Sequence, residues 1–389
     1  MSQMHVATLW AADGLPAARL LATALLVACA GLVAGRLLAV TVGHLVESPP
    51  RGRFLDRAVV GAVAAVTLAL WWWEVRLGSQ LPAGSGPPSA DDGLSLVVRC
   101  AGHLILLLLL AAASWIDLRH RVIPDAITVP GVLAGMTAAA LWPDVLLPIA
   151  RAVPRSFAPP LLEPDVLGAF GCLRDAWPAG LGPAPALPGL VWAAVIFATW
   201  WLVGTERSVL ATGGMPWWRR AVIEPRNLVA VVGAGIIANA WLAGGLHWRG
   251  LISSLVGLAV AAGIIWLTRA GASRALGREA MGLGDVTLMA MIGAWLGWQP
   301  CVLICFLAVF IGLAHGVIQV VTRSESELPF GPSLCLGAVA VVVWWRPFWE
   351  RTNVFFERPQ ELAIVVGAVI ALTAVTLWGW HRIRSIPVR

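Results

Sequence analysis

Residues 277–298 read GREAMGLGDVTLMAMIGAWLGW, a short charged lead-in followed by an almost unbroken apolar run. One ionisable side chain, Asp285, stands at the start of that run and closes the sequence Gly282-Leu283-Gly284-Asp285. An acid where a membrane segment begins is energetically costly, and such residues usually mark functional sites. The stretch therefore predicts a membrane helix with a working carboxyl group at one end.

The composition of the whole chain places that helix in a polytopic membrane protein. Of the 389 residues, 59% are hydrophobic and 12% are charged, and the mean hydropathy is +0.82. These values lie far outside the range of soluble domains. The formal charge of +6 comes entirely from arginine, because lysine is absent. A basic excess of this size is ordinary for cytoplasmic loops of membrane proteins, so we expect contact with membrane lipid and none with nucleic acid.

The cysteines do not form a metal-binding pattern. The chain holds 6 cysteines without a CxxC pair, and most of them lie in apolar segments. A zinc ribbon is therefore excluded, and no metal site is predicted. Cys301 and Cys305 are one helical turn apart, but no histidine or acid accompanies them, so we interpret them as packing residues.

Apolar windows of membrane-crossing length recur along the chain. Because roughly 20 helical residues cross the hydrocarbon core, we predict an all-α polytopic membrane bundle of about eleven transmembrane helices. The predicted spans are 15–46, 58–75, 94–116, 122–142, 188–204, 227–245, 251–268, 283–298, 300–321, 332–345 and 361–380. No secretory signal is evident, so we expect the first apolar segment to remain in the protein.

The distribution of arginine predicts the orientation of these spans. Short cytoplasmic loops are rich in arginine, and the alternation fits an amino terminus outside and a carboxyl terminus in the cytoplasm of an inner-membrane protein. The outside segments 77–93 and 143–187 are instead rich in Pro, Gly and Ser. Segment 346–360 is the exception, since its arginines are offset by glutamates.

Five segments are predicted from this organisation. The first is a group of amino-terminal spans, the second and fourth hold one candidate aspartate each, the third is an insertion with a Pro-rich external loop and two extra spans, and the last is a carboxyl-terminal span and tail. Their predicted bounds are 1–93, 94–142, 143–248, 249–345 and 346–389.

A second aspartate, Asp117, ends the third predicted span at the same membrane face as Asp285. The two residues are 168 positions apart (285 − 117), so only tertiary packing can unite them. Two neighbouring carboxyl groups do not both ionise cheaply and share one proton near neutral pH. The ionised group can accept a proton from water while the protonated group donates one to a scissile carbonyl, as in aspartic proteases.

Each aspartate also has a purely structural interpretation. Asp117 at a helix end would pair with Arg119 or Arg121, and Asp285 would be a helix N-cap. Two such residues at one membrane face favour the acid/base pair instead. The glycines beside Asp285, Gly282 and Gly284, permit close approach of an extended peptide.

Three segments together resemble the type IV prepilin peptidase family, which belongs to the GxGD aspartic membrane proteases. The sequence WIDLRHRVIPDAITVP, residues 115–130, is similar to the family's first-aspartate motif. Residues 277–299 resemble its second-aspartate motif, with Thr287 where lysine is usual, and LPFGPSLCLGA, residues 328–338, resembles the Pro-Phe-Gly-Pro segment that follows.

The resemblance implies an aspartyl endopeptidase that removes the leader of type IV prepilin or pseudopilin-like precursors at the cytoplasmic membrane face. Those precursors are the implied protein partners, and the proteolysis needs no cofactor. The implied catalytic residues are Asp117 and Asp285, and the residues that support the motifs are Gly282, Gly284, Pro124, Asp125, Pro329 and Gly331.

Two departures from the family concern its other activity, methylation with S-adenosylmethionine. Larger members carry a zinc-binding insertion between their first two spans, whereas the interval here is only about residues 47–57. The segment 31–45, GLVAGRLLAVTVGHL, resembles a degraded GSFLNVVIYRLP motif with Arg36 at the serine position and Ala39 at the asparagine position. Both departures argue against methyltransferase activity and against a role for S-adenosylmethionine.

Two other functions fit the residues. In a transporter or channel, Asp117 and Asp285 would bind a cation or relay protons. Transport predicts polar residues through the centres of the spans, whereas the polar groups of this sequence gather at one face. An inactive relative that binds prepilin-like chains is the other alternative, and the intact aspartate motifs argue against it.

Overall fold

The computed structural model describes residues 17–45, 53–80, 90–147, 187–204, 225–277, 279, 281–322, 330–356, 362–368 and 371. Every regular element within these ranges is a helix, and they contain no strand. The prediction of an all-α fold is therefore confirmed.

The described helices make the chain a multi-pass membrane protein. Seven of them are long and apolar enough to cross a membrane, or eight if one bent pair counts as a span. The shorter apolar helices 125–141 and 283–296 lie where two further spans were predicted. All predicted spans contain helical residues, although the count of about eleven transmembrane helices stays a prediction.

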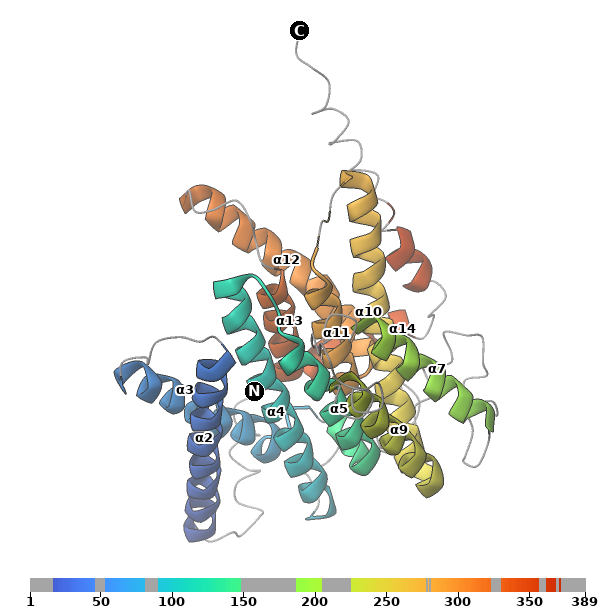
Figure 1. Ribbon diagram of the computed structural model, residues 1–389. Coiled ribbons are helices and arrows are strands. Elements are labelled where there is room, and N and C mark those ends of the chain that lie inside the picture. Colours follow the sequence, from blue (N-terminus) through green and yellow to red (C-terminus); the bar gives the residue numbers. More distant parts are fainter. Residues whose placement is uncertain are drawn as a thin grey trace, which may run out of the picture. The chain divides into compact units, whose positions relative to one another are not determined.

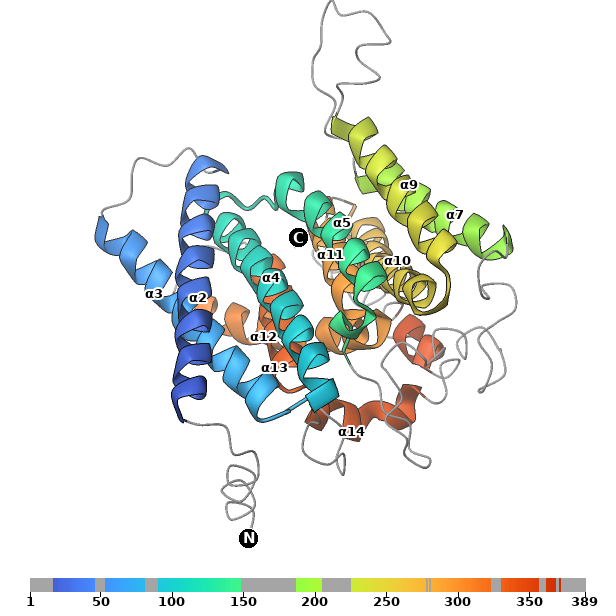
Figure 2. The same ribbon diagram turned by 90° about the horizontal axis from the view of Figure 1, so that it is seen from below.

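The chain divides into two compact units, residues 1–108 and 109–389. The first contains α2 (Ala17–Leu45), α3 (Arg53–Trp71), the π-helical segment η1 (Trp72–Arg76) and the beginning of α4 (Ala90–His120). Helices α2 and α3 lie side by side (Figures 1 and 2). A Cβ atom added to Gly31 would lie 2.8 Å from the Cα of Ala64, and one added to Gly35 would lie 2.8 Å from the Cα of Val60. This Gly-xxx-Gly spacing therefore permits the two backbones to meet closely, as small residues do in membrane helices.

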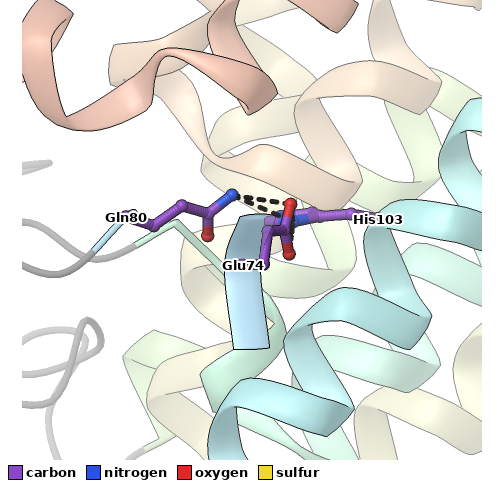
Figure 3. Close-up of polar contacts among 3 residues, drawn as sticks. All are labelled: Glu74, Gln80 and His103. Atoms are coloured by element: carbon purple, nitrogen blue, oxygen red, sulfur yellow. Dashed lines mark hydrogen bonds and ion pairs between the residues drawn. The ribbon is translucent and has the colours of Figure 1, made fainter. Parts of the chain in front are cut away.

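A buried polar cluster connects η1 with α4 inside the first unit (Figure 3). The His103 Nδ1 lies 2.9 and 3.0 Å from the two carboxylate oxygens of Glu74, and the Gln80 amide donates a hydrogen bond of 2.8 Å to Glu74. All three side chains are buried. Polar side chains are tolerated away from water when they are hydrogen-bonded, as these three are. No sequence pattern predicted a contact between Glu74 and His103.

The second unit holds the rest of α4 and the helices that follow it. These are α5 (Asp125–Leu141), the short η2 (Pro143–Val145), α7 (Leu187–Gly204), α9 (Pro225–Ala243), α10 (Gly245–Leu276), α11 (Leu283–Leu296), α12 (Trp298–Thr322), α13 (Gly331–Val343) and α14 (Trp345–Phe356). Helices α7 and α9 lie where two extra spans were predicted for the insertion, and the predicted Pro-rich loop lies outside the described residues.

Helix α11 is the centre of this unit and packs against both α5 and α10. A Cβ atom on Gly293 would lie 2.2 Å from the carbonyl oxygen of Gly257 in α10, so the two helices touch backbone to backbone. The Ser254 hydroxyl donates to the Ala294 carbonyl at 2.7 Å. On the other side, the Trp295 indole donates to the Gly131 carbonyl in α5 at 2.9 Å. These contacts fix the helix that begins with the Gly-Leu-Gly-Asp sequence.

Helix α13 packs along α12 and then turns sharply into α14. The angle between α13 and the first part of α14 is 87°. Trp345 and Trp349 stack on α14, and Phe356 packs edge-on against Trp298, which follows the end of α11. The aromatic side of α14 therefore packs against the beginning of α12, which follows α11.

Candidate functional site

The first aspartate lies in the last turn of α4. The helix continues to His120, slightly beyond the predicted end of the span. It stops because Arg121 adopts a left-handed conformation with φ of 55° and its amide donates to the Asp117 carbonyl at 2.8 Å. Such a turn closes the end of a helix. The chain then leads through Ile123 to Pro124, the N-cap of α5.

The second aspartate occupies the first turn of α11. Gly282 is the N-cap of that helix, with φ of −69° and ψ of 153°, so Asp285 is not the cap itself. The Thr287 hydroxyl instead donates to the Gly284 carbonyl at 3.0 Å. Asp285 is 8% exposed and Asp117 is 5% exposed. Both carboxyl groups are therefore held away from bulk solvent.

The two aspartates converge around the first turn of α13. A Cβ atom added to Gly331 would lie 2.5 Å from Oδ2 of Asp117 and 2.9 Å from Cδ1 of Ile123. A Cβ atom added to Gly284 would lie 3.0 Å from Cβ of the same Ile123. Ile123 is thus the apolar contact between the beginnings of α11 and α13. The carboxyl groups are close enough for the charge of Asp117 to act on Asp285.

Helix α13 also contributes a thiol to the site. Cys335 lies one turn after Gly331, is buried, and interacts electrostatically with both aspartates. Its side chain is hydrogen-bonded to that of Ser114, which precedes Asp117 by one turn of α4. Sequence reasoning missed Ser114, Ile123 and Cys335. The i, i+3 spacing of Ser114 and Asp117 places both residues on one helix face, and this spacing could have identified Ser114 from the sequence.

The other predicted residues are distributed around this site. Pro124 caps α5 and Asp125 begins it, as their place in the first-aspartate motif suggested. Gly282, Gly284 and Gly331 lie at the first turns of α11 and α13. Pro329 lies outside the described residues.

The Arg119 guanidinium, two residues after Asp117, lies 4.8 Å from the centroid of the Trp115 ring. This position is typical of a cation–π interaction at a membrane interface. The helix-end interpretation of Asp117 therefore does not account for Arg119.

The end of α7, in the predicted insertion, lies near the first turn of α11. A Cβ atom on Gly204 would lie 3.4 Å from the Trp200 indole nitrogen and 3.8 Å from the methyl carbon of Thr287. Thr287 is two residues from Asp285. It stands where lysine is usual in the second-aspartate motif that residues 277–299 resemble. The last turn of α7 therefore packs beside the first turn of α11.

This arrangement suits proton transfer. A search of the described residues finds no group of three His, Cys, Asp or Glu side chains placed to hold a metal ion. Two interacting carboxyl groups share a proton and titrate as a pair, which supplies one acid and one base. The beginnings of α11 and α13 both lie at the pair, and the positive end of a helix dipole favours a neighbouring negative charge. The site can therefore hold one negative charge and one transferable proton.

Comparison with known proteins agrees with this geometry. Residues 104–154 and 218–317 match the model of the type IV leader peptidase family. These segments contain both aspartates. No solved structure matches the chain.

Several proteins called prepilin leader peptidase/N-methyltransferase are similar to the chain. The one from Aeromonas hydrophila is 30% identical over 124 residues, which cover 28% of this chain and 43% of the relative. The one from Pectobacterium carotovorum is 31% identical over 185 residues, 46% of this chain and 58% of the relative. The one from Pseudomonas aeruginosa is 41% identical over 71 residues, 18% of this chain and 24% of the relative. The chain thus matches less than two thirds of the length of these relatives. Both aspartate segments lie in the family match, so the chain is similar to the type IV leader peptidase family over those residues.

Proposed function

We propose that the chain is an aspartyl endopeptidase that cleaves the leader peptide of type IV prepilin or pseudopilin-like precursors. The observation that carries this proposal is the convergence of Asp117 and Asp285 from distant helices around Gly331. The relatives named prepilin leader peptidase support the choice of substrate. The arginine-rich loops support an inner-membrane location with the site at the cytoplasmic face.

In the proposed reaction, the ionised aspartate accepts a proton from a water molecule as the water oxygen attacks the scissile carbonyl carbon. The protonated aspartate donates its proton to the carbonyl oxygen, which gives a neutral tetrahedral diol. In the collapse of the diol, the aspartate that is now ionised takes a proton from one diol hydroxyl, the C–N bond breaks, and the leaving amine takes the proton of the other aspartate. Every proton transfer in this scheme uses one of the chain's own two carboxyl groups as donor or acceptor, so the proposed proteolysis involves no cofactor.

Methyl transfer is not part of the proposal. The relatives carry N-methyltransferase in their names, but Arg36 and Ala39 replace the polar residues of the amino-terminal motif. S-adenosylmethionine is therefore not proposed as a cofactor.

The test is cleavage of a synthetic precursor peptide, with a basic leader and a hydrophobic stem, by the full chain in lipid vesicles. Wild type should cut at one bond before the stem, as mass spectrometry of the products would show. Asp117→Asn and Asp285→Asn change shape little but remove an acid/base group, so each should lower kcat by about 100- to 10,000-fold. Asp144→Asn, at the other end of α5, is the matched control and should cut like wild type. Normal cleavage by both site variants would refute the proposal.

A further inference from the structure

The segment between α10 and α11 leads directly into the first turn of α11, which holds Asp285. Helix α10 ends at Leu276, and Gly277 follows in the left-handed conformation with φ of 64°. The segment finishes at Gly282, the N-cap of α11. Glycine at both ends leaves many backbone conformations open. A contact from outside the segment restricts that freedom.

Arg269 makes that contact from two turns before the end of α10. Its Nε donates a hydrogen bond of 2.8 Å to the carbonyl oxygen of Met281, the residue before the N-cap. Its Nη2 pairs with the carboxylate of Glu279. The Arg269 guanidinium thus binds both a backbone carbonyl and a side chain of the segment. The Met281 carbonyl lies only four residues before Asp285 (285 − 281 = 4).

The ion pair between Arg269 and Glu279 is exposed to solvent on the Glu279 side. The Arg269 side chain is 21% exposed, whereas that of Glu279 is 60% exposed. Exposed ion pairs contribute little. The hydrogen bond to the Met281 carbonyl is therefore the anchor, and Glu279 orients the guanidinium that makes it.

We infer that Arg269 is a positioning residue, which holds the beginning of α11 so that the Asp285 carboxyl group faces Asp117. It does so through the segment 277–282 and touches neither aspartate. The planar guanidinium presents donors in fixed directions, which a lysine ammonium does not reproduce. This inference rests on the proposed function, because the position of Asp285 matters through the reaction it is proposed to perform.

The first test is the kinetics of Arg269→Gln in the precursor-peptide assay. Misplacement of a reacting group by about 1 Å costs roughly 100-fold in rate, so kcat should fall by about 10- to 100-fold. KM should stay within about 2-fold of wild type, because the contact is made to the enzyme and not to the substrate. Arg269→Lys keeps the charge but should remain at least about 5-fold below wild type. Glu279→Gln leaves the Met281 contact in place and should lower kcat by less than about 5-fold.

The matched control is Arg274→Gln. Arg274 lies in the last turn of the same helix and is exposed, so its substitution removes the same charge from the same end of α10. Its kcat and KM should equal those of wild type. An Arg274→Gln variant as impaired as Arg269→Gln would overturn the inference in favour of a general charge effect.

A second measurement does not depend on cleavage. Amide hydrogen exchange over residues 279–286 should be at least about 10-fold faster in Arg269→Gln, since loss of the anchor frees the segment, and unchanged in Arg274→Gln. Unchanged exchange, or wild-type kcat in Arg269→Gln, would overturn the positioning role. If Arg269→Gln does not fold, Arg269→Lys takes its place in both measurements. If wild type cleaves no precursor peptide but exchange responds as expected, the proposed function fails and the anchor stands.

Discussion

Gly331 lies directly against the carboxyl group of Asp117, with so little space between them that a Cβ atom on the glycine would come within 2.5 Å of Oδ2. Heavy atoms that are not bonded do not approach so closely. Glycine at the first position of α13 is therefore a steric condition for the observed position of Asp117.

We predict that Gly331→Ala lowers kcat for the precursor peptide by about 10- to 100-fold, because the added methyl group must displace the carboxyl group or α13. Gly263→Ala in α10 is the control, since a Cβ atom there meets nothing within 4 Å. Steady-state kinetics of both variants, normalised to the folded protein, measure the difference. Wild-type kcat in Gly331→Ala would show that the contact does not position Asp117.

Because Gly293 contacts Gly257, we predict that alanine has opposite effects on the melting temperature at Gly293 and at Gly263. Alanine in place of glycine within a helix normally stabilises it by up to about 1 kcal/mol, and Gly263→Ala should raise the melting temperature in detergent. Gly293→Ala should lower it, because its Cβ atom would lie 2.2 Å from the Gly257 carbonyl oxygen and overpacking costs about 1–3 kcal/mol. A rise in melting temperature for both variants would mean that α10 and α11 do not touch there.

The cluster around Glu74 predicts a loss of stability. Glu74→Leu leaves the buried His103 and Gln80 side chains without their shared acceptor, and an unsatisfied buried polar group costs about 1–3 kcal/mol. Denaturant unfolding in detergent would measure this cost. Glu350→Leu is the control, because Glu350 forms an exposed i, i+4 ion pair with Arg346 and pairs of this kind contribute about 0.3–0.5 kcal/mol. Equal effects of the two substitutions would contradict the structural role of the cluster.

The sequence sufficed for the helices, and it singled out the two carboxyl groups of the candidate site. Long apolar runs predict membrane helices because every backbone group must be satisfied within the lipid, and Asp117 and Asp285 stand out because charge is rare there. The alternation of arginine and apolar segments also indicated that both aspartates share one face.

The contacts that assemble the site were not readable from the sequence. Ile123 lies between Gly284 and Gly331 only because α4, α11 and α13 meet there, and an isoleucine in an apolar sequence carries no signal. Arg269 was one arginine among many in cytoplasmic segments, and its bond to a backbone carbonyl depends on the path of the chain after Gly277. Glu74 and His103 likewise meet through tertiary packing, which local patterns do not encode.

The most direct measurement of the central claim is a double-mutant cycle of Asp117→Asn and Asp285→Asn in the precursor-peptide assay. Two groups that share one proton act as a unit, so the double variant should be no more than about 10-fold slower than the slower single variant. Each single variant should already have lost about 100- to 10,000-fold in kcat. Independent losses that multiply in the double variant, or single variants that cut at the wild-type rate, would contradict a catalytic pair.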